Sequence, residues 1–210
     1  MKKAVVLGKG ELAIKISEWF SQSDEYELVA VVPVIPEPAW TSSLTGWSES
    51  KNIPVISSGD YKDMDFCPDL AISVFYDKIF KKDFIDSCGK ILNLHNSPLP
   101  KYRGVSPINW ALKNKESEHG VTIHEITPGI DDGPIIAQIK YSIYPDIDEV
   151  RDVYKRALKY GYILFEQTAP LFDRIDPRFQ DDSKSLYYDS TKNKFLGDRR
   201  YFTRDEKGAR

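Results

Sequence analysis

Short apolar segments alternate along the chain with longer segments of mixed polarity. The apolar, mostly β-branched runs that we interpret as strands cover residues 4–7, 27–33, 53–56, 70–75, 91–95, 120–126 and 135–143. Helices are predicted over residues 12–20 and 108–112, and Pro107 suits the first turn of the second helix. Near-continuous apolar strands separated by helical lengths are typical of a parallel sheet with helices on both faces. The pattern therefore predicts an α/β fold.

The clearest helix is predicted over residues 146–173. Asp146 and Glu149 stand three residues apart near its start, which is the spacing of a capping box. Residues at helical spacing then define one face: Val150, Tyr154, Ala157, Gly161, Leu164 and Thr168. We interpret this face as a packing surface.

The composition changes near Asp176, and we therefore separate residues 1–175 from a C-terminal extension, residues 176–210. The extension is polar but contains large apolar residues, namely Phe179, Leu186, Tyr187, Tyr188, Phe195, Leu196, Tyr201 and Phe202. Such aromatic content is not typical of a disordered segment. We expect a hairpin that either covers a ligand or contacts a second copy of the chain in a homodimer.

The bulk composition excludes several classes of protein. Hydrophobic residues make up 41% and charged residues 29%, as in ordinary soluble globular proteins, and the net charge of −3 gives no general attraction to nucleic acid. The apolar run at residues 4–7 is too short for a signal peptide, and no stretch approaches a membrane span. Cys67 and Cys88 lack CxxC spacing and are interpreted as buried thiols. We expect a cytoplasmic protein with neither nucleic-acid nor membrane partners.

Asn93-Leu94-His95 ends one of the predicted strands. Residues two apart in a strand point to the same side, so Asn93 and His95 share a face. The carboxyl ends of parallel strands are where open α/β sheets bind ligands. The alternative for an isolated Asn-x-His is a pair of hydrogen-bonded structural side chains.

Two further segments favour the functional interpretation. Residues 96–104, NSPLPKYRG, form a loop that two prolines make rigid. About thirty residues beyond His95 lies GVTIHEITPGIDDGPIIAQ, residues 120–138, in which a strand leads into a Pro-Gly turn, two aspartates and the next strand.

Together these segments resemble the signature blocks of the folate-dependent formyltransferases. That family includes glycinamide ribonucleotide formyltransferase, methionyl-tRNA formyltransferase and the N-formyltransferases of nucleotide-linked amino sugars. The resemblance covers residues 1–175, interpreted as the formyltransferase catalytic domain, and implies a Rossmann-like, mostly parallel sheet with helices on both faces. Pro98 stands where the family usually has leucine, which stiffens the loop and leaves the catalytic residue types unchanged.

The resemblance implies that 10-formyltetrahydrofolate is the co-substrate, that no metal takes part, and that Asn93, His95 and Asp131 are catalytic. Asp131 stands two residues before Gly133, as the family's catalytic aspartate does, and its neighbour Asp132 is the alternative. His124 is interpreted as structural. An amine would attack the formyl carbon, Asn93 and His95 would stabilise the oxyanion, and Asp131 would orient the imidazole or stabilise its charge.

The same resemblance places the pterin of the folate against two loops. The residues concerned are Phe75, Tyr76, Asp77, Lys78 and Ile79, together with Thr127, Pro128, Gly129 and Ile130. For the side chains of Phe75 and Ile79, ordinary core packing is an alternative of equal weight.

The acceptor is expected near Gly8-Lys9-Gly10, where a glycine-rich turn precedes a helix and can hold an anion. Ala13 fills the last glycine position of a G-x-G-x-x-G motif, so a dinucleotide site is disfavoured. Further contacts with the acceptor are expected from the loop after His95 and from the aromatic extension: Ser97, Pro98, Arg103, Gly104, Trp110, Tyr187, Tyr188 and, as another phosphate ligand, Arg199.

Three acceptors compete within the resemblance. Methionyl-tRNA is disfavoured because the chain is acidic and because we expect those enzymes to carry a further C-terminal domain. Glycinamide ribonucleotide is the main alternative, but Glu11 stands where those enzymes usually have serine beside the phosphate. A nucleotide-linked 4-amino-4,6-dideoxy sugar fits best, for surface-polysaccharide (O-antigen) synthesis, since aromatic residues of the extension can stack on a base or a sugar.

Two hypotheses from other classes remain. A hydrolase would release formate from the same donor without an acceptor, and a folate-binding module would bind without turnover. The presence of all three catalytic residue types argues against the module, and the start of the first strand close to Met1 argues against the regulatory domain usual in the hydrolases.

Overall fold

The computed structural model describes residues 1–197 of the 210. They form two compact units, the first made of Met1–Leu94 with Glu125–Pro128 and the second of His95–His124 with the described residues from Gly129 onward. Arg199, Tyr201 and Phe202, which were considered above, lie outside the described residues.

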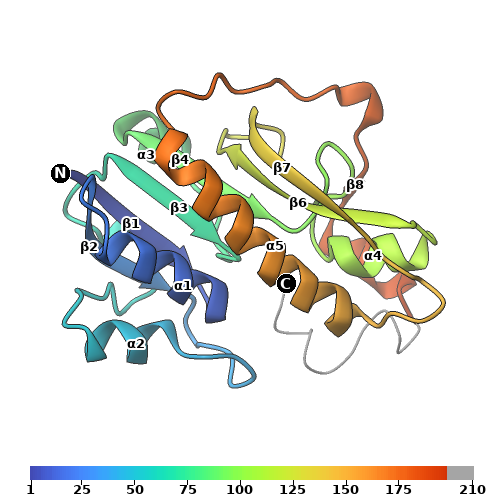
Figure 1. Ribbon diagram of the computed structural model, residues 1–210, viewed down its shortest axis with the longest axis horizontal. Coiled ribbons are helices and arrows are strands. Elements are labelled where there is room, and N and C mark those ends of the chain that lie inside the picture. The colour runs from blue at the N-terminus through green and yellow to red at the C-terminus, as the bar shows by residue number, and fades with distance from the viewer. Residues whose placement is uncertain (198–210) are drawn as a thin grey trace. The chain divides into compact units, whose positions relative to one another are not determined.

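The first unit is built on four parallel strands in the order β2 (Tyr26–Pro33), β1 (Lys2–Gly8), β3 (Leu70–Val74) and β4 (Lys90–His95), as Figure 1 shows. The predicted strand at residues 53–56 is reduced to a single bridge between Val55 and Val31. Helix α1 (Gly10–Ser21) follows β1, while the short helices α2 (Leu44–Ser50) and α3 (Lys82–Ser87) were not predicted. The parallel strands and their helices confirm the α/β class.

The register of the strands explains how the core forms. Val5 on β1 pairs with Ala71 on β3, and Ala71 pairs with Ile91 on β4, so the three side chains form one row on one face. All three are buried. Burying an aliphatic side chain stabilises the fold by about 1.5–3 kcal/mol, so this row contributes several kcal/mol before the entropic cost of ordering it.

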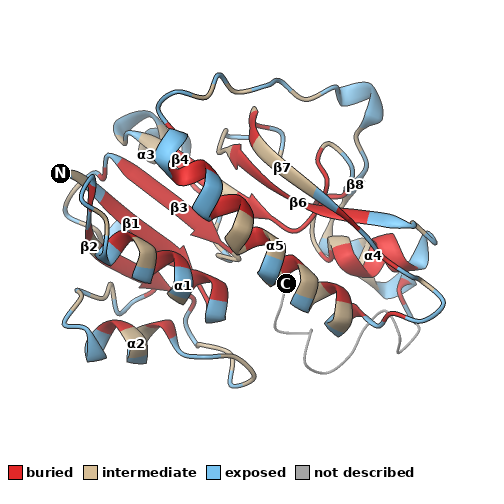
Figure 2. Cartoon of the chain, in the orientation of Figure 1, coloured by how far each residue is buried: buried red, intermediate tan, exposed pale blue. Residues whose placement is uncertain are grey.

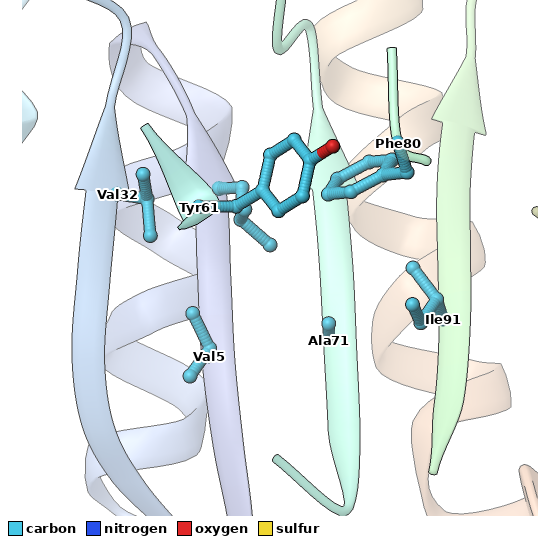
Figure 3. Packing of buried hydrophobic residues seen from close by; sticks show 7 residues of the cluster. Val5, Val32, Tyr61, Ala71, Phe80 and Ile91 are labelled. Carbon is cyan, nitrogen blue, oxygen red and sulfur yellow. The ribbon is translucent and has the colours of Figure 1, made fainter. Parts of the chain in front are cut away.

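Two aromatic rings cover that face. Tyr61, from the 3₁₀ turn Tyr61–Asp63, and Phe80 lie in front of the strands in Figure 3, and helix α1 of the same unit lies behind β1 and β2. The ring centroids of Tyr61 and Phe80 are 4.8 Å apart. The alternating pattern of each strand therefore supplies side chains to both faces of the sheet, which agrees with the prediction of cover on both sides.

The second unit contains the antiparallel pair β6 (Glu118–Glu125) and β7 (Ile135–Ser142) and the parallel pair β5 (Arg103–Gly104) and β8 (Tyr187–Tyr188). Its helices are α4 (Pro107–Lys113) and α5 (Val150–Thr168), labelled in Figure 1. Figure 2 shows buried and exposed residues alternating along α5, as expected for a helix with one packing face. Five of the six residues predicted for that face are buried, and Tyr154 is half-buried.

Helix α5 begins later than the predicted residue 146. Asp148 accepts a hydrogen bond from the Tyr144 N–H at 2.8 Å and pairs with Arg156, so the preceding residues form a turn. The capping box exists, but it is formed by Glu149 and Asp152. The helix ends at Thr168 because Pro170 follows in a 3₁₀ turn.

The described part of the extension differs from the expected hairpin. Arg178 forms an antiparallel bridge with Ile135 of β7, and β8 pairs with β5, so the segment adds to other strands of its unit. Its backbone is therefore tied at two places to the chain around Asp131.

Two further observations concern exposure. Cys67 is exposed and Cys88 is half-buried, so the expectation of two buried thiols was wrong; both are free, and burial raises the pKa of Cys88 to about 11. Over residues 1–197, no helix has the length and apolar character needed to cross a bilayer.

Candidate active site

His95 is the last residue of β4 and only 8% exposed. Its Nε2 lies 2.9 Å from the carbonyl oxygen of Tyr102. Because a carbonyl only accepts, Nε2 must carry a proton. The other ring nitrogen, Nδ1, lies 3.6 Å from Oδ2 of Asp131. A second proton on Nδ1 would therefore give an imidazolium facing a carboxylate.

Asp131 lies in the loop between β6 and β7 with a left-handed backbone, φ 50°. Its Oδ2 accepts a hydrogen bond from the Gly104 N–H at 2.9 Å, and its Oδ1 lies 3.4 Å from Nε2 of His124. Burial disfavours the charged carboxylate, but the charge of His95, the contacts with His124 and the Gly104 hydrogen bond outweigh it and hold the pKa of Asp131 well below its ordinary value. Asp131 is ionised at neutral pH.

The two candidate aspartates occupy different environments. Asp131, with 15% of its side chain exposed, lies beside two imidazole rings, whereas Asp132 is exposed and its carboxylate lies against Gly129. The geometry therefore favours Asp131 as the partner of His95.

His124, interpreted above as structural, has its Nε2 3.4 Å from Oδ1 of Asp131. It sits near the end of β6, is buried, and its ring lies at 82° to that of His95, with centroids 6.3 Å apart. In the sequence, the signal for this proximity is its position at a strand end before the aspartate loop. Asp131 thus lies between two histidines.

The loop after His95 is held by the β6–β7 pair. Thr122 donates from its hydroxyl to the Ser97 carbonyl at 2.7 Å and accepts from the Leu99 N–H at 3.3 Å. Gln138 donates to the Leu99 carbonyl at 2.9 Å and to the Thr122 hydroxyl. These bonds fix the loop that presents the Tyr102 carbonyl to His95, so the rigidity expected from the prolines is reinforced by side chains of the sheet.

His119 has a separate, structural role. Its Nε2 donates to the Asn96 carbonyl at 2.8 Å, and complete burial lowers its pKa to about 4. At neutral pH this imidazole is uncharged and anchors the residue that follows His95.

Asn93 belongs to the first unit, where it pairs in register with Ser73 of β3. It is half-buried. The alternation of β4 directs its side chain to the same side of the strand as His95.

The residues expected to hold the folate divide between the units. Phe75 to Ile79, with Thr127 and Pro128, belong to the first unit, and Gly129 and Ile130 to the second. The Tyr76 hydroxyl donates to the Gly59 carbonyl at 2.8 Å, so this side chain packs inside the first unit. Ile79 is 70% exposed, which leaves its apolar side chain available to a ligand and argues against core packing.

Close packing around the first loop requires glycine at positions 8 and 10. A Cβ at Gly8 would lie 1.9 Å from the Val74 carbonyl oxygen, and a Cβ at Gly10 would lie 2.7 Å from the Thr41 hydroxyl. Lys9 is 3% exposed; its burial lowers the pKa of its ammonium group, and the charge of Asp77 opposes this effect.

Several expected acceptor contacts face the protein itself. Ser97 and Pro98 are buried in the anchored loop, where their side chains pack against the protein. Arg103 is 9% exposed and donates to Gln180 and Asp182. These side chains support the loop, and their contact with an acceptor stays a prediction.

The remaining acceptor candidates lie along the β5–β8 pair. A Cβ at Gly104 would lie 2.1 Å from the Tyr188 carbonyl oxygen, so the close approach of these strands requires glycine. Trp110 is 6% exposed, and its ring stacks on Tyr188 with centroids 4.2 Å apart. Tyr187, 46% exposed, offers more free surface. In residues 1–197, no group of three or more His, Cys, Asp or Glu side chains is arranged to hold a metal ion.

The chain resembles curated proteins over part of their length. It is 40% identical over 125 residues to the bifunctional polymyxin resistance protein ArnA of Wigglesworthia glossinidia brevipalpis, covering 58% of this chain and 19% of that protein. It is 34% identical over 133 residues to the methionyl-tRNA formyltransferase of Fervidobacterium nodosum, and the match covers 63% of this chain and 42% of that protein. The chain thus spans less than half the length of these relatives.

Solved structures match over more of the chain. An N-formyltransferase from Helicobacter canadensis, solved with folinic acid and dTDP-3-aminofucose, has a TM-score of 0.79 and 28% identity over 91% of this chain and 72% of that one. The formyltransferase PseJ from Anoxybacillus kamchatkensis was solved with UDP-4,6-dideoxy-4-formamido-L-AltNAc and tetrahydrofolate. It has a TM-score of 0.64 and 26% identity, and the match covers 99% of this chain and 94% of that one.

The family model described as formyl transferase matches residues 60–168. This range is more than half of the chain and contains Asn93, His95 and Asp131. The chain therefore belongs to the formyl transferase family.

Proposed function

We propose that this protein transfers the formyl group of 10-formyltetrahydrofolate to the amine of a nucleotide-linked amino sugar. The observation that carries the proposal is the ionised Asp131 carboxylate beside the buried His95 ring, in a chain of the formyl transferase family. A buried carboxylate kept charged next to an imidazole is suited to stabilise positive charge on that ring.

In the proposed reaction the acceptor amine attacks the formyl carbon, and negative charge develops on the formyl oxygen. His95 as an imidazolium, balanced by Asp131, supplies positive charge near that oxygen. Because Nε2 is bound to the Tyr102 carbonyl at 2.9 Å, His95 can donate directly to the oxygen only by exchanging that bond. The proton that the amine loses can reach the leaving nitrogen of the folate through the imidazole or through water.

The Asn93 side-chain amide is the second proposed donor to the oxyanion. A preorganised donor of this kind contributes roughly 3–4 kcal/mol to the transition state. Exposed Ile79 and its neighbours in the loop after β3 are the proposed contacts of the pterin. The structures of two relatives solved with a folate compound support folate as the co-substrate.

The acceptor class rests on the same two relatives, whose structures contain nucleotide-linked sugars. One carries a 3-amino sugar on dTDP and the other a 4-formamido sugar on UDP. We propose the 4-amino-4,6-dideoxy class as the acceptor and surface-polysaccharide synthesis as the context, with the 3-amino class as the nearest competitor.

The test is an incubation of the full chain with 10-formyltetrahydrofolate and separate acceptors, followed by mass spectrometry of the products. The acceptors are 3-amino and 4-amino dideoxy sugars on dTDP and UDP, glycinamide ribonucleotide, and no acceptor. We expect an added formyl group on an amino-sugar nucleotide. Turnover on glycinamide ribonucleotide alone, or formate release alone, would overturn the proposal.

The matched variant is His95→Ala, which should lower turnover by at least about 100-fold while the fold is retained, given the usual size of proton-transfer and oxyanion effects. Circular dichroism checks the fold. A variant with near wild-type turnover would remove His95 from the reaction.

Methionyl-tRNA is a second candidate acceptor because a curated relative is a methionyl-tRNA formyltransferase. The net charge of −3 disfavours it, since binding to a nucleic acid backbone depends on basic side chains. Adding methionyl-tRNA to the same panel of acceptors decides between methionyl-tRNA and an amino-sugar nucleotide.

A further inference from the structure

Gln180, in the C-terminal extension, binds the backbone of the loop that carries Asp131. Its Nε2 donates to the Asp131 carbonyl at 2.9 Å and to the Gly133 carbonyl at 2.7 Å. These two carbonyls belong to the turn in which Asp131 adopts a left-handed backbone, φ 50°, a conformation that Asp tolerates better than most residues but less readily than glycine.

The other end of the Gln180 amide faces only donors. Arg103 donates to Oε1 from Nε at 3.1 Å and from Nη2 at 2.9 Å. Every polar atom of the amide is therefore used, and the opposite orientation would place NH₂ against a guanidinium and oxygen against two carbonyls. Asp182 holds the guanidinium through Nη2 at 2.7 Å.

The backbone around Gln180 is fixed on both sides. Arg178 and Ile135 exchange two hydrogen bonds of 2.8 Å, and downstream the Arg103 N–H donates to the Leu186 carbonyl at 2.8 Å. Residue 104 then donates its N–H to the Asp131 carboxylate at 2.9 Å. The extension thus binds the main chain of Asp131 through the Gln180 side chain. It also supports the Asp131 carboxylate indirectly, because β8 pairs with β5, whose Gly104 N–H donates to that carboxylate.

We propose that Gln180 is a positioning residue for the reaction: it holds the loop in the conformation that directs the Asp131 carboxylate at His95. This inference rests on the proposed function, and it assigns to the extension a part in the site beyond covering a ligand or contacting a second copy.

The test compares Gln180→Ala and Gln180→Glu with Gln167→Ala, a control on the exposed side of α5. Gln180→Glu retains an acceptor for Arg103 but cannot donate to the two carbonyls when ionised. Positioning predicts that both Gln180 variants lose about 10-fold to 30-fold in kcat, the usual consequence of losing two neutral hydrogen bonds that favour the active conformation. KM for folate and for the nucleotide sugar should change less than threefold, and the control should match wild type.

A purely structural role predicts instead that activity follows stability, so that Gln180→Glu, which keeps its contact with Arg103, retains kcat. That result, or wild-type kcat in Gln180→Ala, would overturn the proposal.

A second measurement needs no turnover and separates this inference from the proposed function. The imidazole chemical shifts of His95 are recorded by NMR at one fixed pH in wild type and in Gln180→Ala. Displacement of the Asp131 carboxylate, whose Oδ2 lies 3.6 Å from Nδ1 of His95, should change these chemical shifts, whereas Gln167→Ala should leave them unchanged. If the wild type transfers no formyl group to any acceptor but the chemical shifts change in Gln180→Ala, the proposed function fails and the positioning stands; unchanged chemical shifts overturn the positioning.

Discussion

Replacing Asp131 with Asn tests the charge on which the site depends. The amide oxygen of Asn can still accept the Gly104 N–H, which in wild type lies 2.9 Å from Oδ2, so the loop keeps that bond. The variant removes the negative charge beside His95 and leaves the shape of the side chain nearly unchanged.

The magnitude follows from the distance between the charges. Nδ1 of His95 lies 3.6 Å from Oδ2 of Asp131, and at an effective dielectric constant of about 20 the attraction is about 4–5 kcal/mol. Losing it when the imidazolium forms would lower kcat by roughly 1,000-fold, because about 1.4 kcal/mol corresponds to a factor of ten. KM should change little, since neither substrate gains or loses a direct contact.

The assay is the initial rate of tetrahydrofolate formation with the acceptor identified in the panel. Asp132→Asn is the matched control, because it removes one negative charge from the exposed neighbouring side chain. We expect the control to keep at least a third of the wild-type kcat. A loss of less than about tenfold in Asp131→Asn, or a larger loss in Asp132→Asn, would refute the assignment of Asp131 and the charge argument with it.

Folding lowers the pKa of Asp131 below its ordinary value of 3.8. The ionised carboxylate therefore stabilises the fold above about pH 4, and this stabilisation is lost as the pH falls from there through the pKa of the folded state. The stability gap between wild type and Asp131→Asn, from urea unfolding, should therefore be present at pH 5 and shrink below about pH 4; a gap that widens there contradicts the ion pair. Tyr188→Ala removes stacking on Trp110 and should cost about 2–3 kcal/mol of unfolding free energy, whereas an unchanged urea midpoint would mean that the β8 contacts add no stability. Phe80→Ala opens a cavity beside Tyr61 and should cost about 3–5 kcal/mol by the same measurement; a cost under 1 kcal/mol would mean that the face in Figure 3 is loosely packed.

The sequence was sufficient for the parts of the fold that local pattern controls. Continuous apolar runs gave β1, β3 and β4 within one or two residues, because strands buried on both faces carry apolar residues at every position. It was weaker for α2 and α3, which have seven and six residues, because such short helices carry too few turns to establish a period.

The start of α5 shows why a local motif can mislead. Asp146 and Glu149 have capping-box spacing, yet the box forms at Glu149 and Asp152. Asp148 is committed to Tyr144 and Arg156, and this competing set of hydrogen bonds delays the helix by one turn. Residue spacing alone cannot decide between two adjacent sets of acceptors.

For the candidate site, the sequence by itself determined the chemical types and their order: an asparagine and a histidine at one strand end, and an aspartate after the next strand. The position of Asp131 two residues before Gly133 already favoured it over Asp132, and the structure places it beside His95. Only the tertiary structure decided that His124 lies on the other side of Asp131 and that Gln180 binds the backbone of this loop. The physical reason is distance along the chain. Gln180 and Asp131 are 49 residues apart, and which side chains meet over such a separation depends on the packing of whole strands and helices, which no local pattern encodes.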